Sequence, residues 1–323
     1  MRPTFSLVSI LPITALLLNA APATAQPYPS KPIRMITAQA GGGSDVVSRL
    51  IAQGLTERWG RQVVVDNRPG ASTMIGGELV ARAAPDGYTL LMGGNSLAIN
   101  PATFKKIPFD AQRDFAPITQ VMLMPNLLVS HPSLPARDLR ELIALTRARP
   151  GQLLYATAGH GSNPHLMMEL YASMAKVRML HVPYKGSGQS IVDLIGGHVH
   201  LDFDAVPPVI NHVRQGKLRA LAVTSAKRFS LLPDMPTVEE SGVPGFDMST
   251  WWGIVAPAAV SKDIINRLHT EMVKAIRQPD AKEKISGVGA DIVGNTPEEF
   301  AAFIRTETEK YARIVKAANI KID

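Results

Sequence analysis

Cysteine is absent from the 323 residues, and this absence excludes several kinds of chemistry at once. No disulfide can brace the fold, no thiolate can bind a metal, and no cysteine nucleophile can act. No lipid-bearing cysteine is present either, so we expect a protein that is free in its compartment. Long apolar runs are scarce too, because nothing after the first 25 residues approaches the roughly 20 residues of a membrane span.

Dense basic runs and basic–aromatic interleaving are also lacking, although the net charge is +7. Binding to nucleic acid is therefore not indicated. Without Arg2 the charge is +6, and such a diffuse positive surface attracts small anions. A phosphate-binding Walker loop is missing, because no Gly-Lys-Ser/Thr follows a suitable glycine.

The first 25 residues have the features of a secretory signal peptide. Arg2 precedes an apolar run over Leu7–Leu18, and an Ala-x-Ala site follows at Ala23-Thr24-Ala25. The run is too short for a membrane anchor. We therefore expect export, cleavage after Ala25, and a mature chain of residues 26–323.

Short apolar strands alternate with amphipathic helices along the mature chain, in two series. Such alternation favours α/β units with parallel sheets, and two series of similar size indicate two lobes. The expected strands are 33–38, 63–66, 89–92, 127–130, 153–156, 181–183, 199–203 and 219–223. The expected helices are 45–59, 75–84, 139–147, 162–174, 188–195, 206–215, 262–277 and 297–318.

The two C-terminal helices have too few strands beside them to build a sheet of their own, so we expect them to cover lobe one. Lobe one then comprises residues 26–124 and 250–323, and lobe two comprises residues 125–249. The chain crosses between lobes near residues 124 and 250. A double crossing forms a hinge about which two lobes close on a ligand.

Each series contains a glycine-rich loop between a strand and a helix. The loops are Ala40-Gly41-Gly42-Gly43-Ser44-Asp45 and the segment 155–162. Free N–H groups and the dipole at a helix start favour a negative group, although the first loop is equally consistent with a tight turn capped by Ser44 or Asp45. Two such loops facing one cleft at the carboxyl ends of strands suit a carboxylate.

Motifs for catalysis or a cofactor are incomplete. The third glycine of a dinucleotide fingerprint falls on Val46. A nucleophile elbow around Ser162 fails, because His160 and Pro164 replace its glycines. Ser162 and His165 share a helix face, but such a pair is more often structural. We therefore expect no cofactor, no catalytic residue and no enzymatic activity.

The row His198-x-His200-x-Asp202-x-Asp204 places four side chains on one strand face. Alternate residues lie ~6.6 Å apart along a strand, so this row cannot surround one ion. A metal site is not favoured here, and we expect His198 and His200 to lie near a loop while only Asp204 reaches the carboxyl end of the strand. An exported metal-dependent hydrolase using His198, His200 and Asp202 remains the alternative from another class.

Short motifs in a constant order identify a family. The chain resembles the extracytoplasmic solute receptors of tripartite tricarboxylate transporters, the Bug-type receptors, along nearly the whole mature chain. The motifs that carry the resemblance are Tyr28-Pro29-Ser30-Lys31-Pro32-Ile33-Arg34, Gly41-Gly42-Gly43-Ser44-Asp45, Asp66-Asn67-Arg68-Pro69-Gly70-Ala71, Ala84-Pro85-Asp86-Gly87-Tyr88-Thr89-Leu90, Asn100-Pro101, Asp114-Phe115-Ala116-Pro117, His181-Val182-Pro183-Tyr184-Lys185-Gly186, Gly216-Lys217-Leu218-Arg219-Ala220-Leu221-Ala222-Val223-Thr224, Pro233-Asp234-Met235-Pro236-Thr237 and Thr296-Pro297-Glu298-Glu299-Phe300.

The resemblance implies a type II, two-lobed periplasmic binding protein of the Venus-flytrap kind. It implies a carboxylated ligand, such as a dicarboxylate, a tricarboxylate, an acidic amino acid or an aromatic acid, held between the two glycine loops and selected by Asp204. Membrane transporter subunits, or alternatively a membrane sensor, are the implied partners of a monomeric receptor. The expected ligand-binding residues are Ala38, Gln39, Gly42, Gly43, Ser44, Asn95, Ser96, Thr157, Gly159, Gly161, Ser162 and Asp204.

One loop departs from the family pattern. The family usually has Pro-Phe-x-Pro before the first glycines, and here the four positions are Thr37, Ala38, Gln39 and Ala40. The loss of the phenyl ring and both prolines predicts a roomier and more polar pocket wall. Gln39 is able to donate or accept a hydrogen bond there. The choice of ligand within the carboxylate class therefore stays open, and an amino acid bound through Asp202 and Asp204 is included.

Overall fold

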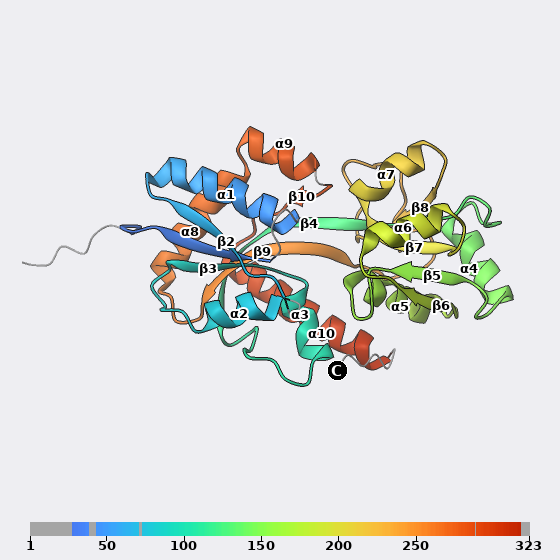
Figure 1. The fold of residues 1–323 in the computed structure, drawn as a ribbon, viewed down its shortest axis with the longest axis horizontal. Helices are drawn as coiled ribbons and strands as arrows, with labels where there is room; N and C mark the ends of the chain where they lie inside the picture. Colours follow the sequence, from blue (N-terminus) through green and yellow to red (C-terminus); the bar gives the residue numbers. More distant parts are fainter. Residues whose placement is uncertain (1–27, 39–42, 71–72, 288, 318–323) are drawn as a thin grey trace, which may run out of the picture.

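The structure is a computed structural model that describes residues 28–38, 43–70, 73–287 and 289–317, and it confirms the two-lobed α/β fold (Figure 1). The strands are β1 Ile33–Thr37, β2 Val63–Asn67, β3 Thr89–Gly94, β4 Phe115–Ser130, β5 Leu154–Thr157, β6 Leu180–Pro183, β7 Leu201–Ala205, β8 Arg219–Val223, β9 Ser249–Pro257 and β10 Asp291–Ile292. The helices are α1 Gly43–Trp59, α2 Met74–Ala81, α3 Ser96–Thr103, α4 Leu139–Ala148, α5 Asn163–Ala175, α6 Ser187–Ile195, α7 Val206–Arg214, α8 Lys262–Ile276, α9 Pro279–Gly287 and α10 Pro297–Ala317. Within the described ranges no helix combines the length and apolarity of a membrane span.

Lobe one is a sheet with helices on both faces. Its strand order is β2-β1-β3-β9-β4, with β1, β2 and β3 parallel, β9 antiparallel to both its neighbours, and β10 paired to β4. Apolar side chains of α1, α8 and α9 pack on one face, and those of α2, α3 and α10 pack on the other. The chain after β9 therefore returns to lobe one, where α8 buries Ile265, Leu268 and Met272.

Lobe two repeats this layering with fewer strands. Its order is β8-β4-β7-β5-β6, and β5 is parallel to both β6 and β7. Helices α4 and α5 contribute to the core on one face, and α6 and α7 to the core on the other. The carboxyl ends of β5 and β7 therefore lie at one edge of the sheet, where the glycine loop begins.

One strand passes through both sheets. The first part of β4 pairs with β9 as far as Pro125 opposite Ser249, and its last residues pair with β7 and β8 (Figure 1). The crossings expected near residues 124 and 250 fall in this paired segment. Two adjacent strands thus connect the lobes, an arrangement that permits hinge motion.

The sequence prediction missed β4 as far as Asn126, which is most of the strand, and all of β9. Most residues of β4 are buried, so its sequence lacks the alternation that marks a half-exposed strand. Pro117 and Pro125 are also unusual within a strand, because proline has no N–H to donate to a neighbouring strand. The helices α3 and α9 were not expected either.

The favoured interpretation of this segment, with His198 and His200 near a loop, agrees with the structure. The strand β7 begins at Leu201, so His198 and His200 precede it. The ring of His200 instead accepts a hydrogen bond at Nδ1 from the backbone N–H of Leu154 (2.9 Å). The metal-dependent hydrolase therefore has no support in this segment.

Candidate functional site

The lobe-one glycine loop joins β1 to α1. Of the residues expected here, Gln39 and Gly42 lie outside the described residues, while Ala38, Gly43 and Ser44 are described. The buried Thr37 hydroxyl donates to Ser44 Oγ (3.4 Å), and the side chain of Asn67 donates to Ala38 O (3.4 Å). The first contact joins the end of β1 to the start of α1, and the second joins the residue after β1 to the neighbouring strand β2.

Trp252 on β9 lies over the start of α1, and the sequence analysis did not anticipate it. A Cβ atom at Gly43 would overlap the Trp252 ring, and one at Gly94 would lie 2.8 Å from Trp252 Cδ1. The indole thus packs directly against backbone at two of the expected pocket segments. Gly43 is required at least in part for this close approach, not only for a ligand.

Asn95 follows β3 and is buried. Its Nδ2 donates to Ser249 O (2.9 Å) and to Tyr311 Oη (2.8 Å), and its Oδ1 accepts from the Trp251 N–H (3.0 Å). The neighbouring Ser96 shares a hydrogen bond with the hydroxyl of Thr73 (2.6 Å). The Asn95 amide thus already bonds to three protein groups. A direct contact between Asn95 and the ligand stays a prediction.

The lobe-two glycine loop runs from β5 to α5. Gly159 (φ 132°) and Gly161 (φ 68°) have backbone conformations that favour glycine. Ser162 Oγ donates to Gly159 O (2.7 Å) and caps α5 by accepting from the backbone N–H of His165 (3.4 Å). Thr157 Oγ1 also accepts from the Gly159 N–H (3.2 Å), so side chains hold the loop in shape.

Three histidines gather behind this loop: His160, His165 and His181, with ligand-capable atoms within 4.8 Å of one another. The rings of His165 and His181 stack with centroids 4.0 Å apart and planes 10° apart, and His160 lies edge-on to both. Burial, followed by the neighbouring histidines, lowers the pKa of His165 to about 4 and of His181 to about 3. His165 and His181 are therefore neutral at pH 7.

The arrangement of these rings does not fit a shared metal ion. A ligated ion lies close to the plane of each imidazole, and two stacked, nearly parallel planes do not meet at one point. His165 Nδ1 also accepts from the Gly161 N–H (3.0 Å), which leaves the proton of the neutral ring on Nε2. The cluster instead supports the loop. Sequence spacing gave no indication of it, because strand pairing brings His181 to the other two.

Asp204 on β7 lies opposite Leu127 of β4, close to the crossing between lobes. Its Oδ1 accepts from the Ala205 N–H (2.7 Å), while its buried Oδ2 has no partner within the described residues. Burial raises the pKa of Asp204 to about 6. Burial and then the charge of Asp204 raise the pKa of Asp202 well above its usual value. Both carboxyl groups therefore hold their protons to higher pH than an exposed aspartate does.

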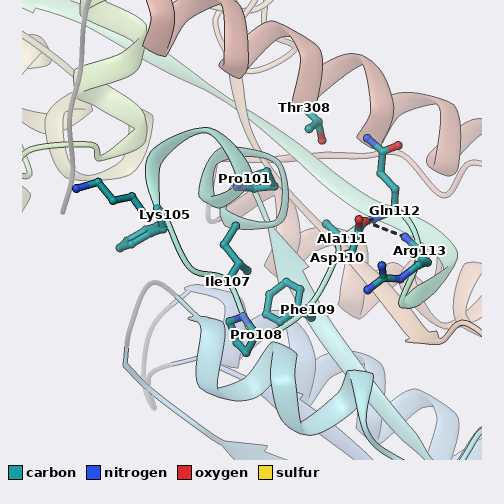
Figure 2. A pocket seen from close by; sticks show the side chains of 11 residues that line it. Pro101, Lys105, Ile107, Pro108, Phe109, Asp110, Ala111, Gln112, Arg113 and Thr308 are labelled. Carbon is teal, nitrogen blue, oxygen red and sulfur yellow. Dashed lines mark hydrogen bonds between the residues drawn. The ribbon is translucent and has the colours of Figure 1, made fainter.

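A surface cavity of about 850 Å³ lies elsewhere, along the connection from α3 to β4 (Figure 2). Its lining includes Lys105, Phe109 and Thr308 and shares no residue with the expected ligand-binding set. At its rim the carboxylate of Asp110 already accepts from the backbone N–H groups of Gln112 (2.9 Å) and Arg113 (3.0 Å). Nothing in this cavity resembles the paired loops.

Comparisons with known proteins agree with the two-lobed α/β fold. Residues 47–320 match the family described as tripartite tricarboxylate transporter family receptor. Protein BugT of Bordetella pertussis is 38% identical over 306 residues, which cover 94% of each chain. The solved structure of R. palustris Rpa4515 with adipate has a TM-score of 0.77 at 33% identity, covering 91% of this chain and 99% of that one. MatC from Rhodopseudomonas palustris with bound malate has a TM-score of 0.73 at 28% identity, covering 89% of this chain and 100% of that one.

The match extends over most of the chain and includes the glycine loop of lobe two and both crossing strands, and it begins just after the glycine loop of lobe one. Fold and sequence therefore lead to the same assignment. The protein belongs to the family of tripartite tricarboxylate transporter receptors, which are solute-binding proteins and not enzymes.

Proposed function

We propose that this receptor captures a small carboxylate between its lobes and delivers it to a membrane transporter. The observation that carries the proposal is the pair of glycine loops, each of which follows a strand and opens a helix in its own lobe. Helix starts favour a negative group without any buried arginine. The solved relatives with adipate and with bound malate support the same ligand class.

The proposed ligand contacts are the twelve residues named from the sequence, of which Gln39 and Gly42 lie outside the described residues. The loops hold one carboxylate, and Asp204 contacts the far end of the ligand. A protonated Asp204 donates to a second carboxylate, whereas an ionised Asp204 accepts from a hydroxyl or an amino group. This difference makes Asp204 the residue that selects among acids.

A thermal-shift screen of the protein against dicarboxylates, tricarboxylates, aromatic acids and amino acids tests the proposal. A ligand at a hundred times its Kd adds roughly 2.7 kcal/mol of stability. We expect a clear shift with one acid class, weakened by Asp204→Asn but not by Asp234→Asn at an exposed position. Silence from every acid would overturn the proposed function. An unchanged Kd in Asp204→Asn would remove that residue alone from the site.

A receptor of this family belongs in the periplasm and works with a membrane transporter. We further propose cleavage after Ala25, a monomeric state, and lobes of residues 26–124 with 250–323 and of residues 125–249. The signal peptide lies outside the described residues. N-terminal sequencing and light scattering of the exported protein test the first two points, and limited proteolysis tests the lobe boundaries.

A further inference from the structure

Tyr311 of α10 connects the two lobes through its hydroxyl group. The side chain is fully buried, and burial keeps the pKa of its hydroxyl well above the usual value, so the group is protonated. Its oxygen accepts from Asn95 Nδ2 (2.8 Å), and its proton is donated to Asn163 Oδ1 (2.9 Å). One atom therefore bridges a residue of lobe one and a residue of lobe two.

Both partners of Tyr311 adjoin the expected ligand segments. Asn95 directly follows β3, and Asn163 is the first residue of α5, immediately after the cap Ser162. A displacement of either asparagine would carry the adjoining segment with it. The Tyr311 hydroxyl thus sets the distance between one ligand segment of each lobe.

The same network reaches the crossing strands. Asn163 Nδ2 donates to Thr250 Oγ1 on β9 (3.2 Å), and Thr250 Oγ1 donates to Asn126 Oδ1 on β4 (3.2 Å). On the other side, Asn95 Nδ2 also donates to Ser249 O (2.9 Å). The chain of hydrogen bonds therefore includes α10, the start of α5 and both strands of the hinge.

Helix α10 makes other contacts with lobe two near this network. Lys310, which pairs with the buried Glu307 of the same helix, donates to Asp247 O of lobe two (2.9 Å). One continuous apolar cluster also joins residues of α10 and of α5. Figure 1 shows the C-terminal part of α10 passing beneath the crossing strands toward α5. A hinge rotation must accordingly stretch or break the bond between Tyr311 and Asn163.

We propose that Tyr311 is a positioning residue, whose hydroxyl fixes the angle between the lobes and thereby the relative placement of the two ligand segments. Its relevance to ligand capture rests on the proposed function. The bond itself, and its effect on the angle between lobes, do not depend on the identity of the ligand. The hydroxyl group, and not the aromatic ring, carries this role.

The absence of cysteine allows a direct test, because two introduced cysteines accept spin labels without competition. Labels at Gln53 in α1 and at the exposed Val192 in α6 report the distance between lobes by pulsed electron spin resonance, without ligand. Tyr311→Phe should change the populations in the distance distribution. The ratio of molecules with the label distance seen here to molecules with other label distances should fall about fivefold, which corresponds to the net worth of ~1 kcal/mol of one hydrogen bond.

Tyr171→Phe is the matched control, since Tyr171 is equally buried in α5 but its hydroxyl has no partner among the described residues. Asn163→Ala removes the same bond from the side of lobe two, and it replaces Tyr311→Phe as the test variant if Tyr311→Phe does not fold. The two changes together should be non-additive. Distances identical to wild type, or an equal effect of Tyr171→Phe, would overturn the proposal.

A second arm adds saturating adipate as the probe. One outcome is that adipate leaves the label distances unchanged while Tyr311→Phe still shifts them without ligand. That result would contradict adipate as a ligand and would leave the positioning role of Tyr311 supported. If adipate closes the lobes equally in wild type and in Tyr311→Phe, with equal Kd values, the hydroxyl does not position the ligand segments. We expect closure in both proteins but a Kd about fivefold lower for the variant, because closure then no longer has to break the bond between Tyr311 and Asn163.

Discussion

Replacing Asp204 with asparagine should make the protein more stable at neutral pH and leave its stability nearly unchanged in acid. The carboxyl group is only 4% exposed, and its Oδ2 has no hydrogen-bond partner within the described residues. Asparagine keeps the size of the side chain and an oxygen that accepts from the Ala205 N–H. The substitution therefore removes mainly the cost of a buried charge.

The size of the effect follows from the pKa of Asp204, which burial raises from 3.8 to about 6. Between these values the native protein binds more protons than the unfolded chain, so its stability falls as pH rises. A shift of roughly two units corresponds to about 3 kcal/mol at pH 7. Removing this charge also eases the ionisation of Asp202, and this second effect has the same sign.

Urea unfolding of both proteins at several pH values between 3.5 and 8 measures the difference in the free energy of unfolding. We expect this difference to be flat below about pH 4, to rise up to about pH 6 and to be flat above it. Asp234→Asn, at an exposed position, should show no such rise. Parallel curves for wild type and Asp204→Asn would refute the assignment of a buried, raised carboxyl group.

Three further expectations concern the neighbouring features. The pKa of His165 is lowered to about 4, so its contribution to the free energy of unfolding is fully present above pH 6.5 and falls by up to about 3 kcal/mol as pH drops toward 4. Urea unfolding of His165→Asn, compared in the Asp204→Asn background, should not show this loss. Gly43→Ala should destabilise the protein by about 1–3 kcal/mol and lower its Tm, because the new methyl group overlaps Trp252. Gly188→Ala in α6, which has open space around it, should not lower the Tm. Equal Tm values for the two variants would contradict the packing argument. Treatment with a chelator should leave the Kd for a bound carboxylate unchanged, and a loss that zinc restores would show that the histidine cluster holds a metal after all.

The spacing of residues along the chain was enough to predict most helices and strands. Apolar residues at helical spacing mark α8, and runs of β-branched residues mark β2. The long central strand β4 and its partner β9 escaped, because strands buried on both faces lose the alternation that identifies them. The two strands that connect the lobes were thus recognised only as approximate crossing points.

The sequence by itself determined the fold class, the two lobes, the absence of thiol chemistry and the two glycine loops, because these depend on local pattern and on residue type. It also pointed to Asp204, but not to the burial that raises its pKa. The tertiary structure alone decided that Trp252 covers Gly43, that His181 joins His160 and His165, and that Tyr311 bridges the lobes. The reason is physical: each of these contacts joins residues far apart in the chain, and only the order and pairing of the strands bring them together.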